Sequence, residues 1–160
     1  MASSAVDAKS TPEAQLRSLI EKFDAKEQKF IRSVRSAVRK RLPTANELVY
    51  DYKSFFVITY SSTDHPMGGI VTTSARPDGM RLYLANGPKL PDPKKLLKGS
   101  GKETRFIQLE TARQLAHRDV EALIVAAIDK ASVPLPSKGR GTLIIRTFAG
   151  KRRPSRKAAK

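Results

Sequence analysis

Apolar residues recur at helical spacing in the first quarter of the chain. Two groups of them lie three or four positions apart, as on one face of a helix. They are Leu16, Leu19, Ile20 and Phe23, and then Phe30, Ile31, Val34 and Val38. Ser10 or Thr11 can cap a helix before the first group, and Asp24 can cap one before the second. The pattern predicts one long kinked helix or two consecutive helices that end before Pro43, with basic residues mostly on the opposite face.

After residue 43 the hydrophobic period changes to two, which is typical of strands. Segments rich in β-branched and aromatic residues lie at 46–52, 55–60, 69–75, 80–85, 104–109 and 142–147. Turn-forming residues separate several of them, and Pro77-Asp78-Gly79 predicts a hairpin. Apolar residues between Val120 and Ile128 predict a helix that opens at Thr111 and ends before Pro134.

The order of these segments predicts a single α+β domain. Neighbouring strands joined by short turns pair antiparallel, and the alternation of strands and helices that a doubly wound nucleotide fold requires is missing. We expect a mostly antiparallel sheet of about five strands, flanked by one or two N-terminal helices and a C-terminal helix. The expected parts are a disordered N-terminus at 1–10, the domain at 11–149 and a disordered basic tail at 150–160.

The charge of the chain points to negatively charged partners. There are 31 Lys and Arg against 15 Asp and Glu, a net charge of +16. Residues 138–160 contain nine of the basic residues and no acidic one, so the rest of the chain carries +7. Such a balance favours nucleic acid, an anionic membrane surface or phosphorylated small molecules.

Cysteine usage and hydropathy bear on the compartment. The 160 residues include no cysteine, which excludes disulfides, thiolate zinc sites and cysteine nucleophiles and fits a reducing compartment. No apolar run approaches the roughly 20 residues that cross a bilayer, and the N-terminus does not resemble a secretory signal. We therefore expect a cytoplasmic location and no membrane span.

Gly99-Ser100-Gly101-Lys102 invites comparison with a phosphate-binding loop of the Walker type, which requires Gly, four residues, and then Gly-Lys-Ser/Thr. Leu96 occupies the position of the first glycine, and Glu103 occupies that of the Ser or Thr. Lys102 also leads into a strand-like segment, whereas a phosphate loop enters a helix. We interpret Gly99 and Gly101 as backbone positions of a bend that returns the chain to the sheet.

The segment around these glycines resembles the signature of the YdhG-like family, a family of domains of unknown function. The matching residues are Leu82, Gly87, Leu90, Asp92, Pro93, Leu96, Leu97, Gly99, Gly101, Lys102 and Arg105. The resemblance covers most of the chain, about residues 24–150, but residues 49–56 stand where the family often has an aromatic-Gly-x-Pro element. It implies an α+β fold with an antiparallel sheet flanked by helices, and no established reaction. One branch of the family is linked to frataxin-like iron handling.

The loop 87–105 is the first candidate binding site. Lys102 and Arg105 are its main candidates, and free backbone N–H groups near Gly99 and Gly101 could form an anion nest. An arginine can hold a carboxylate or a phosphate through two hydrogen bonds. The alternative is an ordered surface loop with solvated lysines, in which Asp92 starts a turn or pairs with Arg105.

Two further groups of residues are candidates. Tyr50 and Tyr52 would point to the same side of a strand, where they could stack on bases, line a small-molecule pocket or belong to the core. The tail would bind nucleic acid without sequence preference, or only keep the chain in solution. Its candidate residues are Lys151, Arg152, Arg153, Arg156 and Lys157.

The sequence contains no recognisable catalytic constellation, cofactor motif or metal site. Asp64 and His65 are adjacent in a turn and His117 starts a helix, but no spacing joins them into a ligand set. The leading hypothesis is a non-enzymatic domain that binds an anionic small ligand or partner protein. Non-specific nucleic-acid binding is the first alternative and iron handling is the second. The ligand, the pathway and the oligomeric state stay open.

Overall fold

The computed structural model describes residues 11–147 of the chain. Its helices are α2 (Pro12–Ile20), α3 (Ala25–Arg41) and α4 (Arg118–Asp129), with the short 3-10 helices η1 (Pro66–Gly68), η2 (Gly87–Lys89) and η3 (Ala112–Ala116). Its strands are β1 (Asn46–Asp51), β2 (Phe56–Ser61), β3 (Gly69–Arg76), β4 (Gly79–Ala85), β5 (Thr104–Leu109) and β6 (Leu143–Ile145). The predicted disordered ends, with the candidate nucleic-acid residues of the tail, lie outside the described residues.

The six strands of the described chain form one sheet in the order β5-β4-β3-β2-β1-β6. Neighbours from β1 to β5 are antiparallel, and β6 runs parallel to β1. The predicted hairpin at Pro77-Asp78-Gly79 joins β3 to β4, and Gly79 takes a φ of 133°. The α+β class and the mostly antiparallel sheet are therefore confirmed. The sheet has one strand more than the approximate number expected, because β6 adds to its β1 edge.

The N-terminal region forms two helices, one of the two outcomes that the sequence left open. Thr11 caps α2, since its hydroxyl accepts a hydrogen bond from the backbone N–H of Ala14 at 3.1 Å. Asp24 caps α3 in the same way, accepting from the N–H of Glu27 at 2.9 Å. Each cap satisfies an N–H that has no partner within its helix.

The C-terminal helix begins later than the sequence predicted. Thr111 opens η3, whereas α4 starts at Arg118. The backbone of His117 is extended and separates the two, and His117 Nδ1 caps α4 by accepting from the N–H of Asp119 at 3.2 Å. No helix between residues 11 and 147 combines the length and apolar composition needed to cross a membrane.

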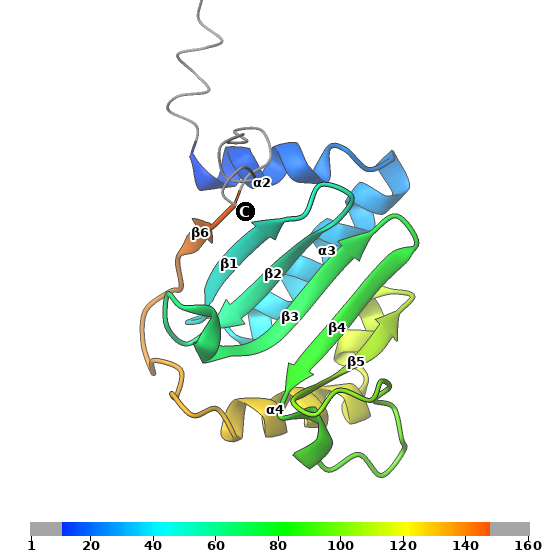
Figure 1. Cartoon of the computed structure of the whole chain (residues 1–160), viewed down its shortest axis with the longest axis vertical. Helices are drawn as coiled ribbons and strands as arrows, with labels where there is room; N and C mark the ends of the chain where they lie inside the picture. The colour runs from blue at the N-terminus through cyan, green and yellow to red at the C-terminus, as the bar shows by residue number, and fades with distance from the viewer. Residues whose placement is uncertain (1–10, 148–160) are drawn as a thin grey trace, which may run out of the picture.

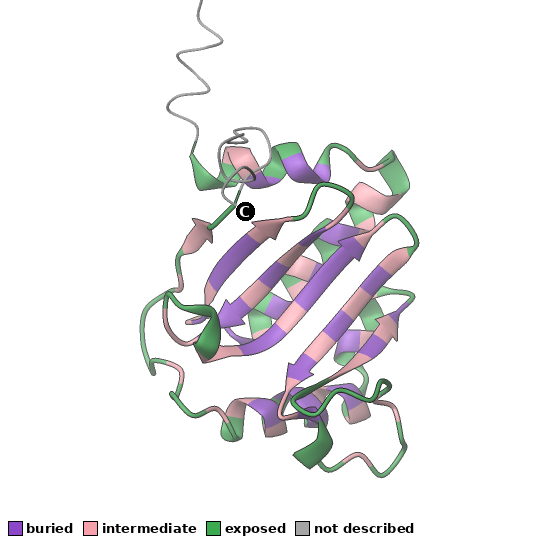
Figure 2. Ribbon diagram, in the orientation of Figure 1, coloured by how far each residue is buried: buried purple, intermediate pink, exposed green. Residues whose placement is uncertain are grey.

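The core lies between one face of the sheet and the helices, with α3 behind the strands in Figure 1. Alternate residues of each strand face it, and in β2 these are Phe56, Ile58 and Tyr60, at 2%, 2% and 0% exposure. Helix α3 contributes Ile31 and Val34. The alternation of buried and half-buried positions along the strands is visible in Figure 2. Burying one such aliphatic side chain stabilises the fold by about 1.5–3 kcal/mol.

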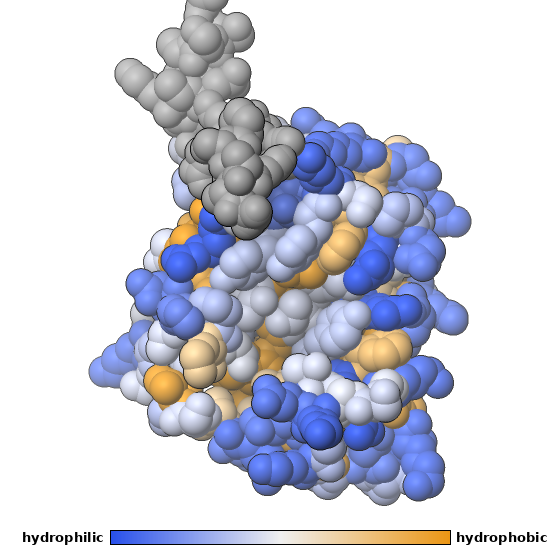
Figure 3. Space-filling model, in the orientation of Figure 1, coloured by the Kyte–Doolittle hydropathy of each residue, from blue (hydrophilic) through white to orange (hydrophobic). Residues whose placement is uncertain are grey.

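The opposite face of the sheet has no described helix in front of it (Figure 1). Figure 3 shows this side of the molecule as a hollow of mixed polar and apolar residues inside a hydrophilic rim. We call it the open sheet face. The strand register places one row of residues across it, namely Tyr50, Val57, Ser74, Arg81 and Gln108.

Candidate functional site

The loop 87–105 uses its polar groups to hold its own shape. The carboxylate of Asp92 accepts hydrogen bonds from the backbone N–H of Leu96 at 2.8 Å and of Leu97 at 2.9 Å. Arg105 donates its Nε–H to the carbonyl of Gly101 at 3.0 Å. Asp92 therefore starts a turn, as one alternative predicted. The alternative pairing of Asp92 with Arg105 is not formed, because each group is bonded to backbone.

The two glycines lie in the bend that the sequence predicted. Lys98 and Phe106 exchange two backbone hydrogen bonds, at 2.7 and 3.1 Å, which close the turn. Gly99 has a φ of 103°, a conformation that few other residues tolerate. Lys102 is exposed and β5 begins two residues after it, so this segment returns to the sheet and does not enter a helix.

The loop and the candidate tyrosines do not come together. Tyr50 lies on β1 and Arg105 on β5, four strand spacings or about 19 Å apart. The register places Tyr50 on the open sheet face and Arg105 on the other face. Tyr52 is 54% exposed and stacks on Phe55, with ring centroids 5.0 Å apart. Lys102, Arg105 and the tyrosines therefore cannot line one site.

A different part of the molecule gathers positive charge around a cavity. A cleft of about 670 Å³ lies between α2, α3 and residues 139–140. Its lining has six cations and one carboxylate, that of Glu13. We call it the basic cleft. Its cations are Arg17, Arg32, Arg35, Arg39, Lys40 and Arg140.

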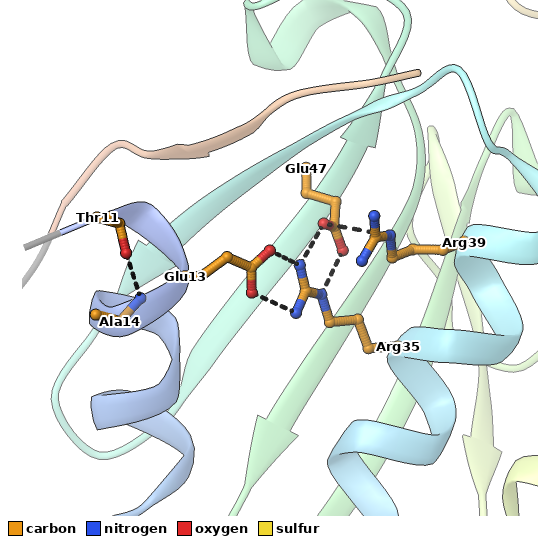
Figure 4. A network of polar contacts seen from close by, with 6 residues as sticks. All are labelled: Thr11, Glu13, Ala14, Arg35, Arg39 and Glu47. Atoms are coloured by element: carbon orange, nitrogen blue, oxygen red, sulfur yellow. Dashed lines mark hydrogen bonds and ion pairs between the residues drawn. The ribbon is translucent and has the colours of Figure 1, made fainter. Parts of the chain in front are cut away.

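Arg35 lies between two carboxylates in the basic cleft (Figure 4). It donates to Glu47 of β1 through Nε and Nη2, both at 2.8 Å. It also donates to Glu13 of α2 through Nη1 at 3.2 Å and Nη2 at 3.0 Å. The side chains of Arg35 and Glu47 are 15% and 5% exposed, whereas that of Glu13 is 56% exposed. Two paired contacts of this kind fix the guanidinium and link α2 to the sheet.

The protonation states follow from these contacts. Burial alone lowers the pKa of Arg35, but its hydrogen bonds with Glu47 and Glu13 outweigh burial and raise that pKa. The hydrogen bond from Arg35 lowers the pKa of Glu13 below its ordinary value of 4.5. Burial, and then the charge of the neighbouring Glu47, raises the pKa of Tyr60. At neutral pH Arg35 is therefore a cation, Glu13 a carboxylate and Tyr60 a neutral phenol.

Four cations of the basic cleft have no ion-pair partner in the described part of the chain. Arg17, Arg32, Lys40 and Arg140 form no ion pair with any residue between 11 and 147. All four line the same cavity, so their charges add to a positive potential there. The arrangement is suited to hold a group with several negative charges.

Local sequence explains how these cations reach the cleft. Arg32, Arg35 and Arg39 are three and four residues apart on α3 and share one helix face. Gly141 allows the segment that carries Arg140 to lie close to Ala45. A Cβ at position 141 would lie 1.6 Å from the carbonyl oxygen of Ala45. Only glycine permits this approach of the two segments.

The sequence analysis selected no residue of the basic cleft. The helical spacing of the three arginines was an available signal, but it was used only to place basic residues opposite the apolar face of the helix. No sequence pattern pointed to the two carboxylates that bind Arg35, because Glu13 is 22 residues from Arg35 and Glu47 is 12 residues from it. Contacts at such separations depend on how the helices pack.

The histidines have structural contacts. His65 Nδ1 accepts a hydrogen bond from the N–H of Met67 at 3.2 Å and caps η1, as His117 caps α4. Between residues 11 and 147 there is no group of three or more His, Cys, Asp or Glu that could hold a metal ion. The hypothesis of iron handling through Asp64 and His65 therefore has no ligand set in this region.

No protein-family model, curated protein or solved structure matches the chain. The resemblance to the YdhG-like family stays a prediction from the sequence of the loop. The functional argument accordingly depends on the chain's own geometry.

Proposed function

We propose that this protein binds a polyanionic small ligand, of the phosphorylated class, in the basic cleft. The observation that carries the proposal is the convergence of Arg17, Arg32, Lys40 and Arg140 on one cavity without carboxylate partners among residues 11–147. The class of function is the one predicted from the composition. The place differs, since the loop 87–105 was expected to hold the ligand.

The dimensions of the cleft agree with a small ligand. Its volume of about 670 Å³ lies within the roughly 300–1,000 Å³ of small-molecule sites. Guanidinium groups suit phosphate oxygens, because their N–H groups form a planar fork that can donate two parallel hydrogen bonds. Leu16 and Ile20 of α2 also line the cleft and give the ligand a limited apolar wall.

Calorimetric titration of the full chain with inorganic pyrophosphate and with ADP tests the proposal. The test variant is the double substitution Arg17→Gln and Arg140→Gln, which removes two exposed cations that have no internal ion pair. A charge-assisted hydrogen bond contributes about 1.5–3 kcal/mol, so we expect affinity to fall at least about tenfold. Binding should also weaken as the salt concentration rises.

The matched control is Lys98→Gln with Lys102→Gln, which changes the net charge by the same amount within the loop 87–105. We expect this control to retain most of the affinity. A loss of affinity confined to the loop variant would show that the ligand binds to the loop 87–105. An equal loss in both variants would show that the ligand responds only to the overall charge. Either result rejects the basic cleft as the site.

A further inference from the structure

The open sheet face carries two clusters in which arginines lie against aromatic rings. The first, which we call the Phe55 cluster, consists of Tyr52, Phe55 and Arg76. The rings of Tyr52 and Phe55 are stacked with their centroids 5.0 Å apart. The Arg76 guanidinium lies over the Phe55 ring, 4.0 Å from its centroid.

The second group, the Phe106 cluster, consists of Arg81, Tyr83 and Phe106. The Arg81 guanidinium lies over the Phe106 ring at 4.5 Å, and the centroids of Tyr83 and Phe106 are 5.5 Å apart. Arg81 also donates its Nε–H to the side-chain oxygen of Gln108 at 3.2 Å. These contacts fix the planes of the rings and guanidinium groups before any ligand arrives.

The arginines of both clusters keep their charge. Neither Arg76 nor Arg81 forms an ion pair with a residue of the described chain. A cation–π contact stabilises a guanidinium without cancelling its positive charge. In each cluster the guanidinium covers a face of the phenylalanine ring, so the ring offered beside the cation is the tyrosine, Tyr52 or Tyr83.

Two polar atoms on the open sheet face lack partners. Ser74 is 1% exposed, and its hydroxyl has no hydrogen-bond partner among residues 11–147. The Nε of Arg76 is also buried without a partner. Ser74 lies in the same row as Arg81 and on the same strand as Arg76, so it stands between the two clusters. Buried polar groups are nearly always satisfied in folded proteins, so these two atoms keep hydrogen-bonding capacity that the described residues do not use.

We propose that the open sheet face binds single-stranded nucleic acid. Unpaired bases stack on Tyr52 and Tyr83, the tyrosine rings of the two clusters, and Arg76 and Arg81 contact phosphates between them. Phe55 and Phe106 are separated by three strand spacings across the sheet and four residues along it, about 14 Å and about 13 Å. A short extended strand that crosses the face diagonally would contact both. This site lies on a different surface from the basic cleft and does not depend on the function proposed there.

The combination of groups selects this ligand class. Stacking platforms beside cations are the usual means by which proteins bind single strands, since every base has a π-face. A double helix keeps its bases stacked inside and cannot reach the rings. A small phosphorylated ligand is too short to contact two aromatic clusters this far apart. The net charge of +16 adds attraction for a polyanion at long range.

Fluorescence anisotropy with labelled twelve-nucleotide oligo(U), oligo(dT) and a DNA duplex of the same length tests the proposal on the full chain. The main variant is Tyr52→Leu with Tyr83→Leu. Its matched control is Phe23→Leu with Phe30→Leu, two half-buried rings on the helical side. Stacking contributes enough per base that we expect the main variant to bind single strands about tenfold or more weakly and the control to bind normally.

Tyr52→Leu provides a variant that keeps the fold, because this ring is 54% exposed. We expect it to weaken single-strand binding severalfold with no change in the unfolding midpoint. Equal affinity for the duplex would overturn the proposal, since duplex bases cannot stack on the rings. Unchanged affinity in the ring variants would also overturn it. The ratio of oligo(U) to oligo(dT) affinity identifies RNA or DNA as the preferred strand.

Charge substitutions separate this surface from the other two basic regions. We expect Arg76→Gln with Arg81→Gln to weaken oligonucleotide binding and to leave pyrophosphate binding unchanged. Arg17→Gln with Arg140→Gln should have the opposite effect. A loss of oligonucleotide binding confined to Arg152→Gln with Arg153→Gln would assign nucleic-acid binding to the tail and reject the open sheet face.

Discussion

The basic cleft and the open sheet face both contain arginines, but the arginines have different kinds of partner in the two places. In the basic cleft, Arg35 is held by the carboxylates of Glu13 and Glu47. On the open sheet face, Arg76 and Arg81 lie against the rings of Phe55 and Phe106. A carboxylate neutralises the cation, whereas a ring supports it and leaves its charge available.

This difference separates the roles of arginines within one molecule. The two carboxylates largely neutralise the charge of Arg35, so the surrounding cations without ion pairs among the described residues are the ones available to a ligand. Arg76 and Arg81 are oriented and still charged, so they are available themselves. The partner of an arginine, more than its exposure, therefore indicates whether it maintains the fold or binds a ligand.

The largest expected effect comes from removing Glu47, the buried carboxylate that pairs with Arg35. Glu47→Ala leaves Arg35 largely buried with only the exposed Glu13 as a partner. Breaking a buried pair by removing one member costs about 3–5 kcal/mol, so we expect the free energy of unfolding in urea to fall by that amount. Glu13→Ala is the matched control, and an exposed pair of this kind contributes about 0–1 kcal/mol. Equal losses in the two variants would contradict the assignment of Glu47 as the main partner of Arg35.

A smaller effect is expected on the open sheet face. Arg76→Met keeps an unbranched side chain over the Phe55 ring and removes the charge. A cation–π contact at a partly exposed site contributes about 0.5–1 kcal/mol, so thermal unfolding should show a loss of that order. Arg113→Met, an exposed arginine with no ring contact among the described residues, should change stability little. If both variants lose the same stability, the ring contact does not stabilise Arg76.

Local sequence was sufficient to predict much of the fold. The hairpin at Pro77-Asp78-Gly79 and the bend at Gly99 depend on backbone conformations that a few adjacent residues determine. The helix caps at Thr11 and Asp24 have the same local origin. The predicted start of the C-terminal α-helix was wrong because Thr111 and His117 can both begin a helix. Only the folded chain shows that Thr111 begins η3 and that α4 follows His117.

The candidate sites depended on contacts that the sequence does not display. Alternation predicted that Tyr50 and Tyr52 point to the same side of a strand, but β1 ends at Asp51 and only Tyr50 belongs to it. Alternation could not show that α3 and α4 would cover the opposite face and leave these rings on the open one. The basic cleft was missed for a similar reason, since Glu13 and Glu47 meet Arg35 only after α2, α3 and β1 have packed together.

The smallest expected effect concerns the exposed carboxylate of the basic cleft and its dependence on pH. The pKa of Glu13 is lowered in the folded protein, chiefly by the hydrogen bond from Arg35. A lowered folded-state pKa means that ionised Glu13 stabilises the fold above its ordinary value of 4.5, and that this stabilisation is lost as the pH falls through the lower folded-state value. Because Glu13 is 56% exposed, the contribution is at most about 1 kcal/mol at neutral pH.

Comparison of the wild-type chain with Glu13→Gln isolates this contribution from the other carboxylates that titrate in acid. We expect the wild-type chain to be the more stable at pH 7 and the difference in unfolding free energy to vanish near pH 2. High salt should reduce the difference at pH 7, because an exposed ion pair is screened. The stability lost in Arg76→Met should persist at pH 2, since a guanidinium and a phenyl ring do not titrate in this range. A Glu13 difference that stays constant from pH 7 to pH 2 would show that its ionised form does not pair with Arg35.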